Sequence, residues 1–382
     1  MQDLSALIVG AGVAGLSCAG LLADRGITAD IVERSPEDTF NTSGYMLGML
    51  PLGGRVLNAL DARKAYFERS IQMEQYEIHH PDGKLVKDYP LGFINKQYGS
   101  YRGITRMNLV DILVQRAGKS RIRFNTTVPG LDRHESHTRV TFSDGSETDY
   151  DVVIIADGLH SKTRDLLLRP SEYTYKDTGW GGWVTWLDEE PAPAYKEYWG
   201  NGSFLGLYPV KGKYGIFLGG PVDRIRSRGL ANFKSDVQDH MSAGYELPNR
   251  ALDAFDEAED PFFWEFHDCR SHTWFKDNVI LLGDAATGFL PTAGVGASMA
   301  MDSAAALADE LSRADRKHIQ YALKLYTQQQ KERVEKAQKD SRHLGKMMFI
   351  NSAVISKLRD ELLPFYSLQR MLSELTKVME GQ

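Results

Sequence analysis

Three glycines near the start of the chain form the pattern with the clearest chemical meaning. The segment Gly10–Gly15, with the sequence GAGVAG, follows the apolar run Ala6–Val9 and opens a stretch with helical periodicity. In such a turn the first glycine allows the tight bend, the second lets the backbone approach a pyrophosphate, and the third lets the helix pack closely on the strand. The helix start also offers free N–H groups and the positive end of the helix dipole to phosphates. We therefore expect a dinucleotide site here.

An acidic residue stands where this kind of turn uses one. The run Ala29–Val32 predicts a second strand, and Glu33 follows it directly. A carboxylate placed about 20 residues after the glycines accepts hydrogen bonds from ribose hydroxyls. The strand, the helix, the second strand and the terminal acid therefore follow one another in the order and at the spacing that dinucleotide binding requires. This motif alone does not separate NAD from FAD.

Two later segments favour FAD. The run Val152–Ile155 predicts a strand that leads to Asp157, and the run Val279–Leu282 predicts another that leads to Asp284. Gly294–Gly296 then opens a further helix. An acid in such a place can accept a hydrogen bond from a ribityl hydroxyl, and the N–H groups of a glycine-flanked helix start can face a flavin carbonyl. The three segments thus look like parts of one flavin site.

Together these segments resemble the class A flavoprotein monooxygenases, the family that includes para-hydroxybenzoate hydroxylase and the tetracycline-inactivating monooxygenases. The resemblance covers about residues 4–345, and its three FAD motifs are specific. In that family the internal Asp-Gly motif is tied to FAD and NAD(P)H, and an arginine lies near the FAD phosphates. The resemblance implies that the cofactor is contacted by Gly10, Gly12, Ala14, Gly15, Glu33, Arg34, Arg106, Asp157, Asp284, Gly294, Gly296 and Ala297.

The same resemblance implies a reaction. NAD(P)H would reduce FAD, O₂ would add to the flavin as a hydroperoxide, and an aromatic or polyketide-like small molecule would be hydroxylated. No second glycine motif of this type follows residue 40, so NADH or NADPH is expected to visit the flavin transiently. No residue is predicted to be an essential general base, and the catalytic residues are therefore not assigned. The chain has Thr287 where the family usually has histidine.

Two other functions agree with the same motifs. One is an FAD-dependent reductase or dehydrogenase that inserts no oxygen, and the other is a flavin-binding protein without turnover. The order of the motifs and the aromatic sheet favour the hydroxylase over the reductase. Oxygen consumption with the product mass would separate those two, and absent NAD(P)H oxidation would indicate the non-catalytic protein.

Aromatic residues gather between Trp180 and Leu218, among β-branched residues and glycines. This composition predicts an antiparallel sheet apart from the nucleotide domain. Tyr208 and Phe217, with Pro291, are the predicted walls of a substrate pocket, and the other interpretation of the cluster is plain sheet core. For Tyr101 and Arg102 there are two interpretations, a hydrogen bond to a substrate and a solvated loop, and the loop is the favoured one.

The predicted fold is α/β. A Rossmann-like FAD-binding domain of the GR2 type carries an inserted, mostly antiparallel substrate-binding sheet and a C-terminal helical tail. We expect the FAD-binding domain to be assembled from residues 1–70, 98–175 and 270–345, the substrate-binding domain from 71–97 and 176–269, and the C-terminal helical segment from 346–382.

Charge and composition narrow the partners. The formal net charge of −6 argues against a broad nucleic-acid footprint. The two cysteines, Cys18 and Cys269, exclude a disulfide framework, and their surroundings predict no metal site. Without a basic leader or a run of about 18 apolar residues, a cytoplasmic protein is expected. We expect a monomer or homodimer, with the apolar face of the C-terminal tail open to gating the substrate entrance or contacting a membrane.

Overall fold

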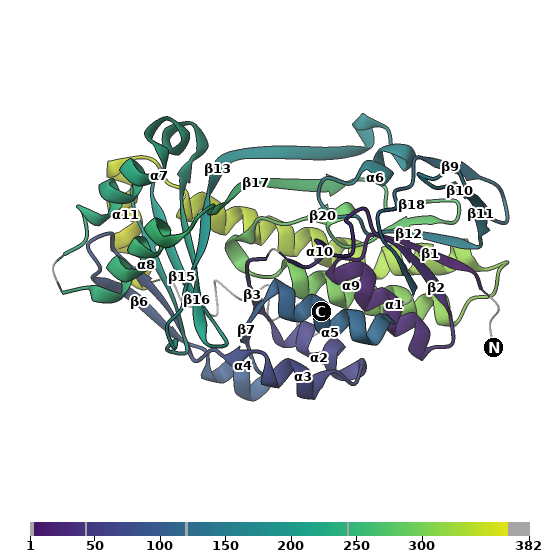
Figure 1. The fold of residues 1–382 in the computed structure, drawn as a ribbon, viewed down its shortest axis with the longest axis horizontal. Helices are drawn as coiled ribbons and strands as arrows, with labels where there is room; N and C mark the ends of the chain where they lie inside the picture. The colour runs from purple at the N-terminus through teal and green to yellow at the C-terminus, as the bar shows by residue number, and fades with distance from the viewer. Residues whose placement is uncertain (1–3, 43, 119–120, 243, 366–382) are drawn as a thin grey trace.

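A mostly parallel sheet forms one end of the molecule (Figure 1). The computed structural model describes residues 4–42, 44–118, 121–242 and 244–365. In spatial order the six strands of this sheet are β18 (Phe275–Lys276), β19 (Val279–Leu281), β12 (Val152–Ile155), β1 (Ala6–Val9), β2 (Ala29–Val32) and β8 (Ile122–Arg123). Only the edge pair β18–β19 is antiparallel among these strands.

The register of this sheet places the cofactor motifs together. Val9 of β1 lies opposite Val32 of β2 and Ile155 of β12. The carboxyl ends of three parallel strands therefore meet at one edge, where Gly10 and Glu33 follow the first two. Ligands of open α/β sheets bind at this edge. The strands β1 and β12 are buried along their whole length, as expected for a parallel sheet covered on both faces.

Three helices lie beside this sheet, and the central one, α1 (Val13–Asp24), packs against both α5 (Arg106–Ala117) and α9 (Gly296–Ser312). A three-stranded antiparallel sheet packs against the same apolar core. The bounds of its strands and of the shorter helices are β9 (Gly130–Arg133), β10 (Thr138–Thr141), β11 (Glu147–Tyr150), α2 (Pro51–Ala59), α3 (Arg63–Glu68), α4 (Gly92–Gln97) and α6 (Lys162–Leu167).

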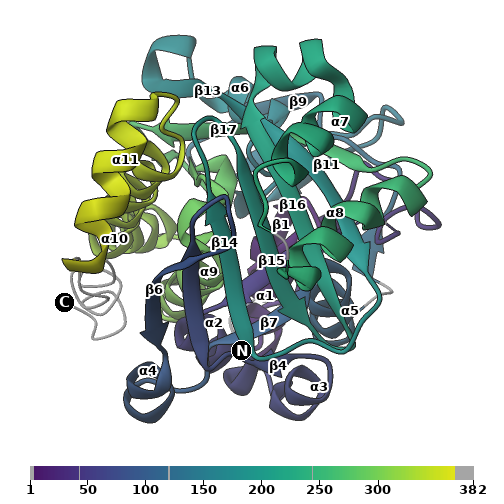
Figure 2. The same ribbon diagram turned by 90° about the vertical axis from the view of Figure 1, so that its left-hand side faces the viewer.

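A larger, mostly antiparallel sheet forms the other end of the molecule and faces the viewer in Figure 2. Its central strands are long, and Figure 1 shows two of them, β13 and β17, running between the two ends of the molecule. In spatial order the eight strands are β20 (Thr287–Gly288), β17 (Phe262–Ser271), β13 (Tyr173–Leu187), β16 (Lys213–Pro221), β15 (Phe204–Val210), β14 (Ala194–Trp199), β5 (Gln75–His79) and β6 (Leu85–Pro90).

Two helices, α7 (Val222–Gln238) and α8 (Glu246–Glu257), cover the outer face of this sheet (Figure 2). The sequence analysis expected a sheet in this region, and the sheet is confirmed, but it did not expect the helices. Their apolar residues are spaced for one buried face, as with Ala251, Leu252 and Phe255 of α8. Each helix therefore buries one stripe on the sheet and leaves the opposite face of the sheet to line the site.

A third, small sheet lies between the two ends and consists of β3 (Met46–Met49), β7 (Arg102–Thr105) and β4 (Ile71–Gln72). The expectation of a solvated loop at Tyr101–Arg102 is therefore wrong. Arg102 is buried, and its Nε donates to Ser70 Oγ at 2.7 Å. These contacts fix the start of β7 against the sheet core, which leaves the preceding Tyr101 facing the interior.

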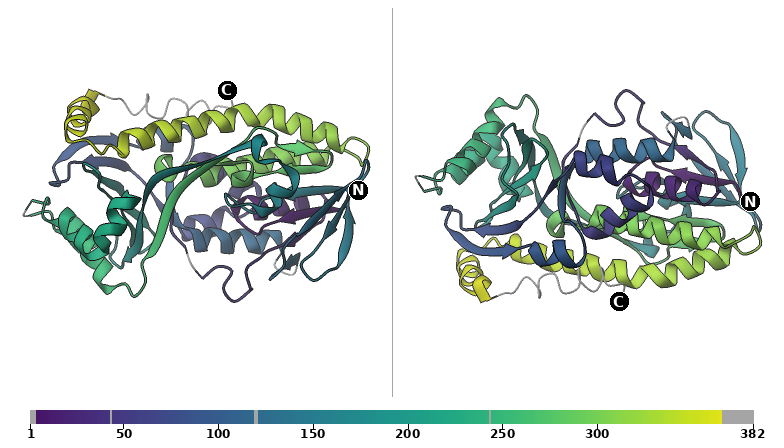
Figure 3. Two further views of the ribbon diagram at one scale, coloured as in Figure 1. Left: turned by 90° about the horizontal axis from the view of Figure 1, so that it is seen from above. Right: turned by 90° about the horizontal axis from the view of Figure 1, so that it is seen from below.

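The C-terminal part of the described chain is helical, as predicted. Helix α10 (Ile319–Met348) runs along the length of the molecule (Figure 3), and α11 (Ala353–Leu362) follows after a short break. Residues 366–382 lie outside the described residues. In the part of the chain that is described, no helix combines the length and apolarity needed to cross a membrane.

Candidate active site

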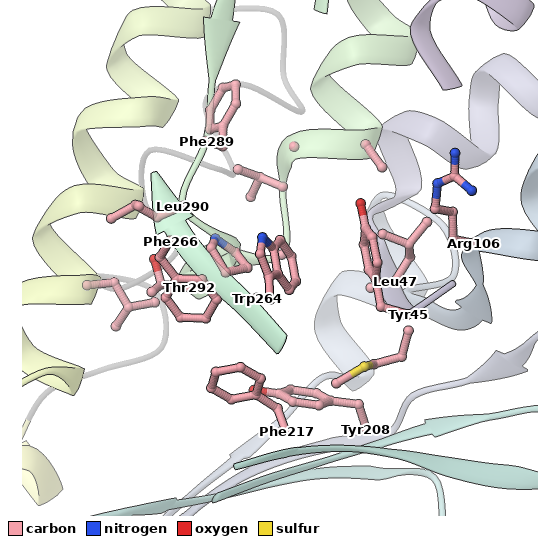
Figure 4. Close-up of a pocket in the computed structure, with 18 of the residues that line it drawn as sticks. Tyr45, Leu47, Arg106, Tyr208, Phe217, Trp264, Phe266, Phe289, Leu290 and Thr292 are labelled. Atoms are coloured by element: carbon pink, nitrogen blue, oxygen red, sulfur yellow. The ribbon is translucent and has the colours of Figure 1, made fainter. Parts of the chain in front are cut away.

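One elongated cavity of about 430 Å³ joins the two ends of the molecule. Gly12 and Ala14 line it from the glycine turn, and Asp284 lines it from the segment after β19. Tyr208 and Phe217 line it from the large sheet, where Figure 4 shows their rings below Trp264 and Tyr45. The structure thus brings residues predicted for the cofactor and residues predicted for the substrate onto one cavity.

The glycine turn has the close approaches that its sequence predicts. Gly10 has φ +106°, and a Cβ there would lie 2.6 Å from the carbonyl oxygen of Ala156. A Cβ on Gly15 would lie 2.0 Å from the carbonyl oxygen of Gly10. Both glycines are therefore needed for the turn itself, and neither lines the cavity.

Gly12 has a different role from its two neighbours. A Cβ added at Gly12 would meet no atom within 4 Å, so the protein leaves space directly in front of this residue. Gly12 is also the N-cap of α1, and no side chain caps the helix there. The first N–H groups of α1 consequently have no side-chain acceptor at the cap, where an anion would be stabilised by the helix dipole.

Glu33 holds the turn from behind. Its Oε2 accepts a hydrogen bond from the N–H of Ala11 at 3.0 Å, and its Oε1 accepts one from the N–H of Ser35 at 2.9 Å. Glu33 and the exposed Arg34 are not among the residues that line the cavity. In this arrangement the carboxylate fixes the backbone between β1 and α1.

Asp157 also stands just behind the cavity wall, which its neighbours Ala156 and Gly158 line. Its Oδ2 accepts a hydrogen bond from the N–H of Thr163 at 3.2 Å. Its Oδ1 is buried and has no hydrogen-bond partner among the described residues. A buried carboxylate oxygen of this kind calls for a donor from a ligand or water.

Asp284 faces the cavity directly. Its exposed side chain opens into the cavity. The protein around it still removes part of its water, and this burial raises the pKa of the carboxyl to about 6. A carboxylate that has lost part of its bulk solvent gains most from a hydroxyl donor. Asp284 is thus placed to accept a hydrogen bond from a ligand in the cavity.

A second helix start faces the same cavity. Gly294 takes the left-handed conformation, with φ +59°, and Gly296 begins α9 without a side-chain cap. Gly294, Gly296 and Ala297 all line the cavity, and so does Arg106 at the start of α5. Thr105 Oγ1 caps that helix by accepting the N–H of Asn108 at 3.1 Å, which fixes the position of Arg106.

These features fit FAD. The space before Gly12 and the helix starts of α1 and α9 suit a pyrophosphate and a flavin carbonyl, and Asp284 suits a hydroxyl of the ribityl chain. Arg106 adds a cation to the same part of the cavity. FAD has a chain of phosphate and hydroxyl groups between two ring systems, and this set of donors and acceptors can bind such a chain.

The sheet end of the cavity is built from aromatic rings above glycines. A Cβ on Gly206 would lie 2.4 Å from the ring of Tyr208, and a Cβ on Gly219 would lie 2.6 Å from the ring of Phe217. The missing side chains let both rings lie close to the sheet, which leaves room above them. The predicted Pro291 lines the same cavity. Flat, apolar walls of this kind suit a planar ring.

Several residues at this end were missed by sequence analysis. Glu197, Tyr76, Tyr195 and Trp264 all line the cavity. Tyr101, for which the sequence analysis favoured a loop over a substrate contact, lines it too. The alternation of large residues in YKEYW, within β14, places every second side chain on one face of the sheet, so it indicates a shared face. That signal does not say which face is the cavity face, because the answer depends on where α7 and α8 pack.

Comparisons with known proteins agree with this geometry. The chain matches the family described as FAD binding domain over residues 3–341. The 6-hydroxynicotinate 3-monooxygenase of Pseudomonas fluorescens is 25% identical to it over 352 residues, which cover 87% of this chain and 89% of that protein. The FAD-dependent urate hydroxylase of Klebsiella pneumoniae is 27% identical, and the match covers 94% of this chain and 95% of that protein.

Solved structures agree on the fold. The crystal structure of Klebsiella pneumoniae HpxO complexed with FAD and uric acid has a TM-score of 0.87 and 22% sequence identity, with 100% of this chain and 98% of that chain covered. The predicted fold, the FAD cofactor and the family resemblance are therefore confirmed. The chain belongs to the FAD binding domain family and is an FAD-dependent monooxygenase of class A.

Proposed function

We propose that this enzyme hydroxylates a small aromatic or heteroaromatic molecule, with NADH or NADPH as the electron source and O₂ as the oxygen source. The observation that carries the proposal is the single cavity that runs from the glycine turn at Gly12 to the aromatic floor at Phe217. A substrate at the aromatic end would lie next to a flavin at the other end, and the two ligands together would displace water from the space between them.

Different residues of this chain would contact different parts of FAD. Gly12, Ala14 and the start of α9 would hold the FAD phosphates and flavin edge, and Arg106 would add positive charge. Asp284 would accept a ribityl hydroxyl. When bound, FAD supplies the redox chemistry with NAD(P)H and O₂, and the protein supplies position and exclusion of water. Gly10, Gly15, Glu33 and Asp157 would support these contacts from behind.

The named substrates of two relatives support an aromatic ring. One relative is named for 6-hydroxynicotinate and the other for urate, and both compounds are planar nitrogen heterocycles. The rings of Tyr208 and Phe217 line the cavity in this chain, below Trp264 and Tyr45, whose rings pack against each other with centroids 4.7 Å apart (Figure 4). Edge and face contacts with such rings favour a planar guest.

The test is turnover with labelled oxygen. Purified protein loaded with FAD would be supplied with NADH or NADPH and a set of small aromatic compounds, and the products weighed by mass spectrometry under ¹⁸O₂. We expect one compound to accelerate NAD(P)H oxidation and to gain one labelled oxygen atom. Reduced product without label would indicate the reductase, and no NAD(P)H oxidation with any compound would indicate a non-catalytic flavoprotein.

A further inference from the structure

A single carboxyl group is buried among the aromatic rings of the substrate end of the cavity. Glu197 lies on β14, is 3% exposed and lines the cavity. It shares the cavity face of the sheet with Tyr195 and Trp199, two positions before and after it. A buried acid among apolar rings is costly unless it is well bonded, so its contacts decide what it can do.

Three side chains donate hydrogen bonds to this carboxyl group. Tyr76 Oη donates to Oε2 at 2.5 Å, and Trp199 Nε1 donates to the same oxygen at 2.9 Å. Tyr208 Oη donates to Oε1 at 2.8 Å. A carboxylate offers about four acceptor positions, and these donors fill three of them. The fourth position belongs to Oε1, the oxygen that Tyr208 also contacts at the cavity floor.

The charges around the cavity are unevenly placed. Among the described residues that line it, three are acids, Glu197, Asp284 and Asp340, and one is a cation, Arg106. Figure 4 shows Arg106 beyond Tyr45 and Leu47, away from Trp264 and the aromatic floor. No cation of the described cavity lining therefore stands at the aromatic end beside Glu197.

This distribution of charges determines which substrates the aromatic end of the cavity can bind. Burial raises the pKa of Glu197 in spite of its three hydrogen bonds, so negative charge is already disfavoured at this end. An aromatic carboxylate would add negative charge there, with no cation of the described cavity lining beside it to offset the charge. An amine or a ring N–H would instead donate a charge-assisted hydrogen bond to Oε1. Tyrosine and tryptophan faces add cation–π attraction if the donor is charged.

We propose that Glu197 selects the substrate class: a small aromatic molecule that carries an amino or other cationic nitrogen donor, and not a carboxylate. The proposal rests on the proposed function, since it assigns the substrate end of the same cavity. Glu197 acts as a specificity-determining residue that touches the substrate, with Tyr76, Trp199 and Tyr208 fixing the carboxylate in place.

The test compares binding of two matched probes to the FAD-loaded protein by isothermal titration calorimetry at neutral pH. 4-Hydroxybenzylamine and 4-hydroxybenzoate share the phenol ring and differ in the sign of the charged group. We expect the amine to bind at least about tenfold more tightly, because a hydrogen bond to a charged group contributes about 1.5–3 kcal/mol. Equal binding, tighter binding of the benzoate, or failure of the amine to bind at millimolar concentration would overturn the proposal.

Two variants assign the preference to one residue. In Glu197→Gln the amine preference should fall by at least about tenfold, since the charge is removed with little change of shape. The control is Glu77→Gln on neighbouring β5, where the carboxylate pairs with Lys196 and His79 and does not line the cavity. Glu77→Gln should keep the preference. An unchanged preference in Glu197→Gln would contradict the assignment.

The comparison in the parent protein needs no variant, so it decides the proposal even if Glu197→Gln fails to fold. It is also separate from the test of function. Amine preference without oxygen insertion would refute the proposed function alone, and hydroxylation of aromatic carboxylates by the parent would refute the role of Glu197 alone.

Discussion

The two ends of the cavity are built in opposite ways. At the glycine end the backbone makes the site, because a Cβ on Gly10 or Gly15 would lie only 2.6 or 2.0 Å from a backbone oxygen, while a Cβ on Gly12 would meet no atom. At the sheet end the side chains make the site, with the rings of Tyr208 and Phe217 lying over glycines. One end thus presents N–H groups and helix dipoles, and the other presents rings and a carboxyl group.

This difference explains why the cofactor is easier to recognise than the substrate. A backbone turn needs a few glycines at fixed spacing, so its ligand is visible in a short motif. A pocket of side chains draws on β5, on the consecutive strands β14, β15 and β16, and on β17, so it combines three segments that are far apart in the sequence. Substitution of a few residues of this pocket changes the substrate that it binds and leaves the fold intact.

The largest effect is expected for Gly15→Val. The new Cβ would lie 2.0 Å from the backbone oxygen of Gly10, which cannot move without opening the turn. We expect loss of FAD and a destabilisation of about 4 kcal/mol or more, measured by thermal unfolding and by the flavin content of the purified protein. Gly92→Val is the control, since a Cβ there meets nothing within 4 Å. A Gly15→Val protein with normal unfolding and full FAD would refute the backbone account.

Gly12→Ala separates cofactor binding from folding. Its Cβ enters open space, so the FAD-free protein should unfold at the same temperature as the parent. The same Cβ would occupy the space proposed for the pyrophosphate, and we expect FAD affinity to fall about 10- to 100-fold. Titration of FAD-free protein with FAD measures the loss. Unchanged affinity would show that the phosphates lie elsewhere.

Gly206→Val tests the other end of the cavity. Its Cβ would lie 2.4 Å from the ring of Tyr208 and would push the ring away from Glu197 into the cavity. We expect the affinity for an aromatic ligand to fall by roughly tenfold, as for the loss of a bond to a charged group, while FAD affinity stays the same. Parallel titrations with ligand and FAD check this. Equal losses of both would mean that the two ends are not independent.

The smallest effect is expected for Asp284→Asn in FAD-free protein. Burial raises the pKa of Asp284 to about 6, so the folded state holds the proton more tightly than the unfolded chain, where Asp titrates near about 4. The charged form therefore costs stability above about pH 6, and the cost vanishes below about pH 4.

Asp284→Asn should consequently be more stable than the parent at pH 8 and equal to it at pH 4. The gain should not exceed about 1 kcal/mol, because the side chain opens to water in the cavity. Unfolding curves at the two pH values measure it. A variant that is less stable than the parent at pH 8 would contradict the raised pKa.

Much of the fold and of the cofactor end follows from local patterns. The strands that precede Gly10, Asp157 and Asp284 are short apolar runs that end at a functional residue, so sequence and structure agree there. The roles of the individual FAD contacts stay predictions, as do the domain boundaries. Strands β13 and β17 run across the predicted boundaries at residues 175 and 269, because each is continuous from one end of the molecule to the other.

The substrate end could be predicted only in part. Tyr208 and Phe217 stand in a recognisable aromatic segment, but Glu197 gains its role from Tyr76, which β5 brings beside β14 by a parallel pairing across more than a hundred residues. The position of Tyr101, for which the loop was the favoured interpretation, does not follow from its own neighbours in the sequence. Its position depends instead on the buried Arg102 and on the small sheet around β7.

The central claim is that one cavity holds FAD at its glycine end and an aromatic substrate at its sheet end. The most direct measurement is the visible spectrum of the FAD-loaded protein during titration with an aromatic ligand. We predict that FAD binds, and that the flavin band near about 450 nm shifts as the ligand saturates, because a ring on the Phe217 floor would lie beside the flavin. A protein that retains no flavin with excess FAD, or a ligand that binds without altering the flavin spectrum, would contradict the account.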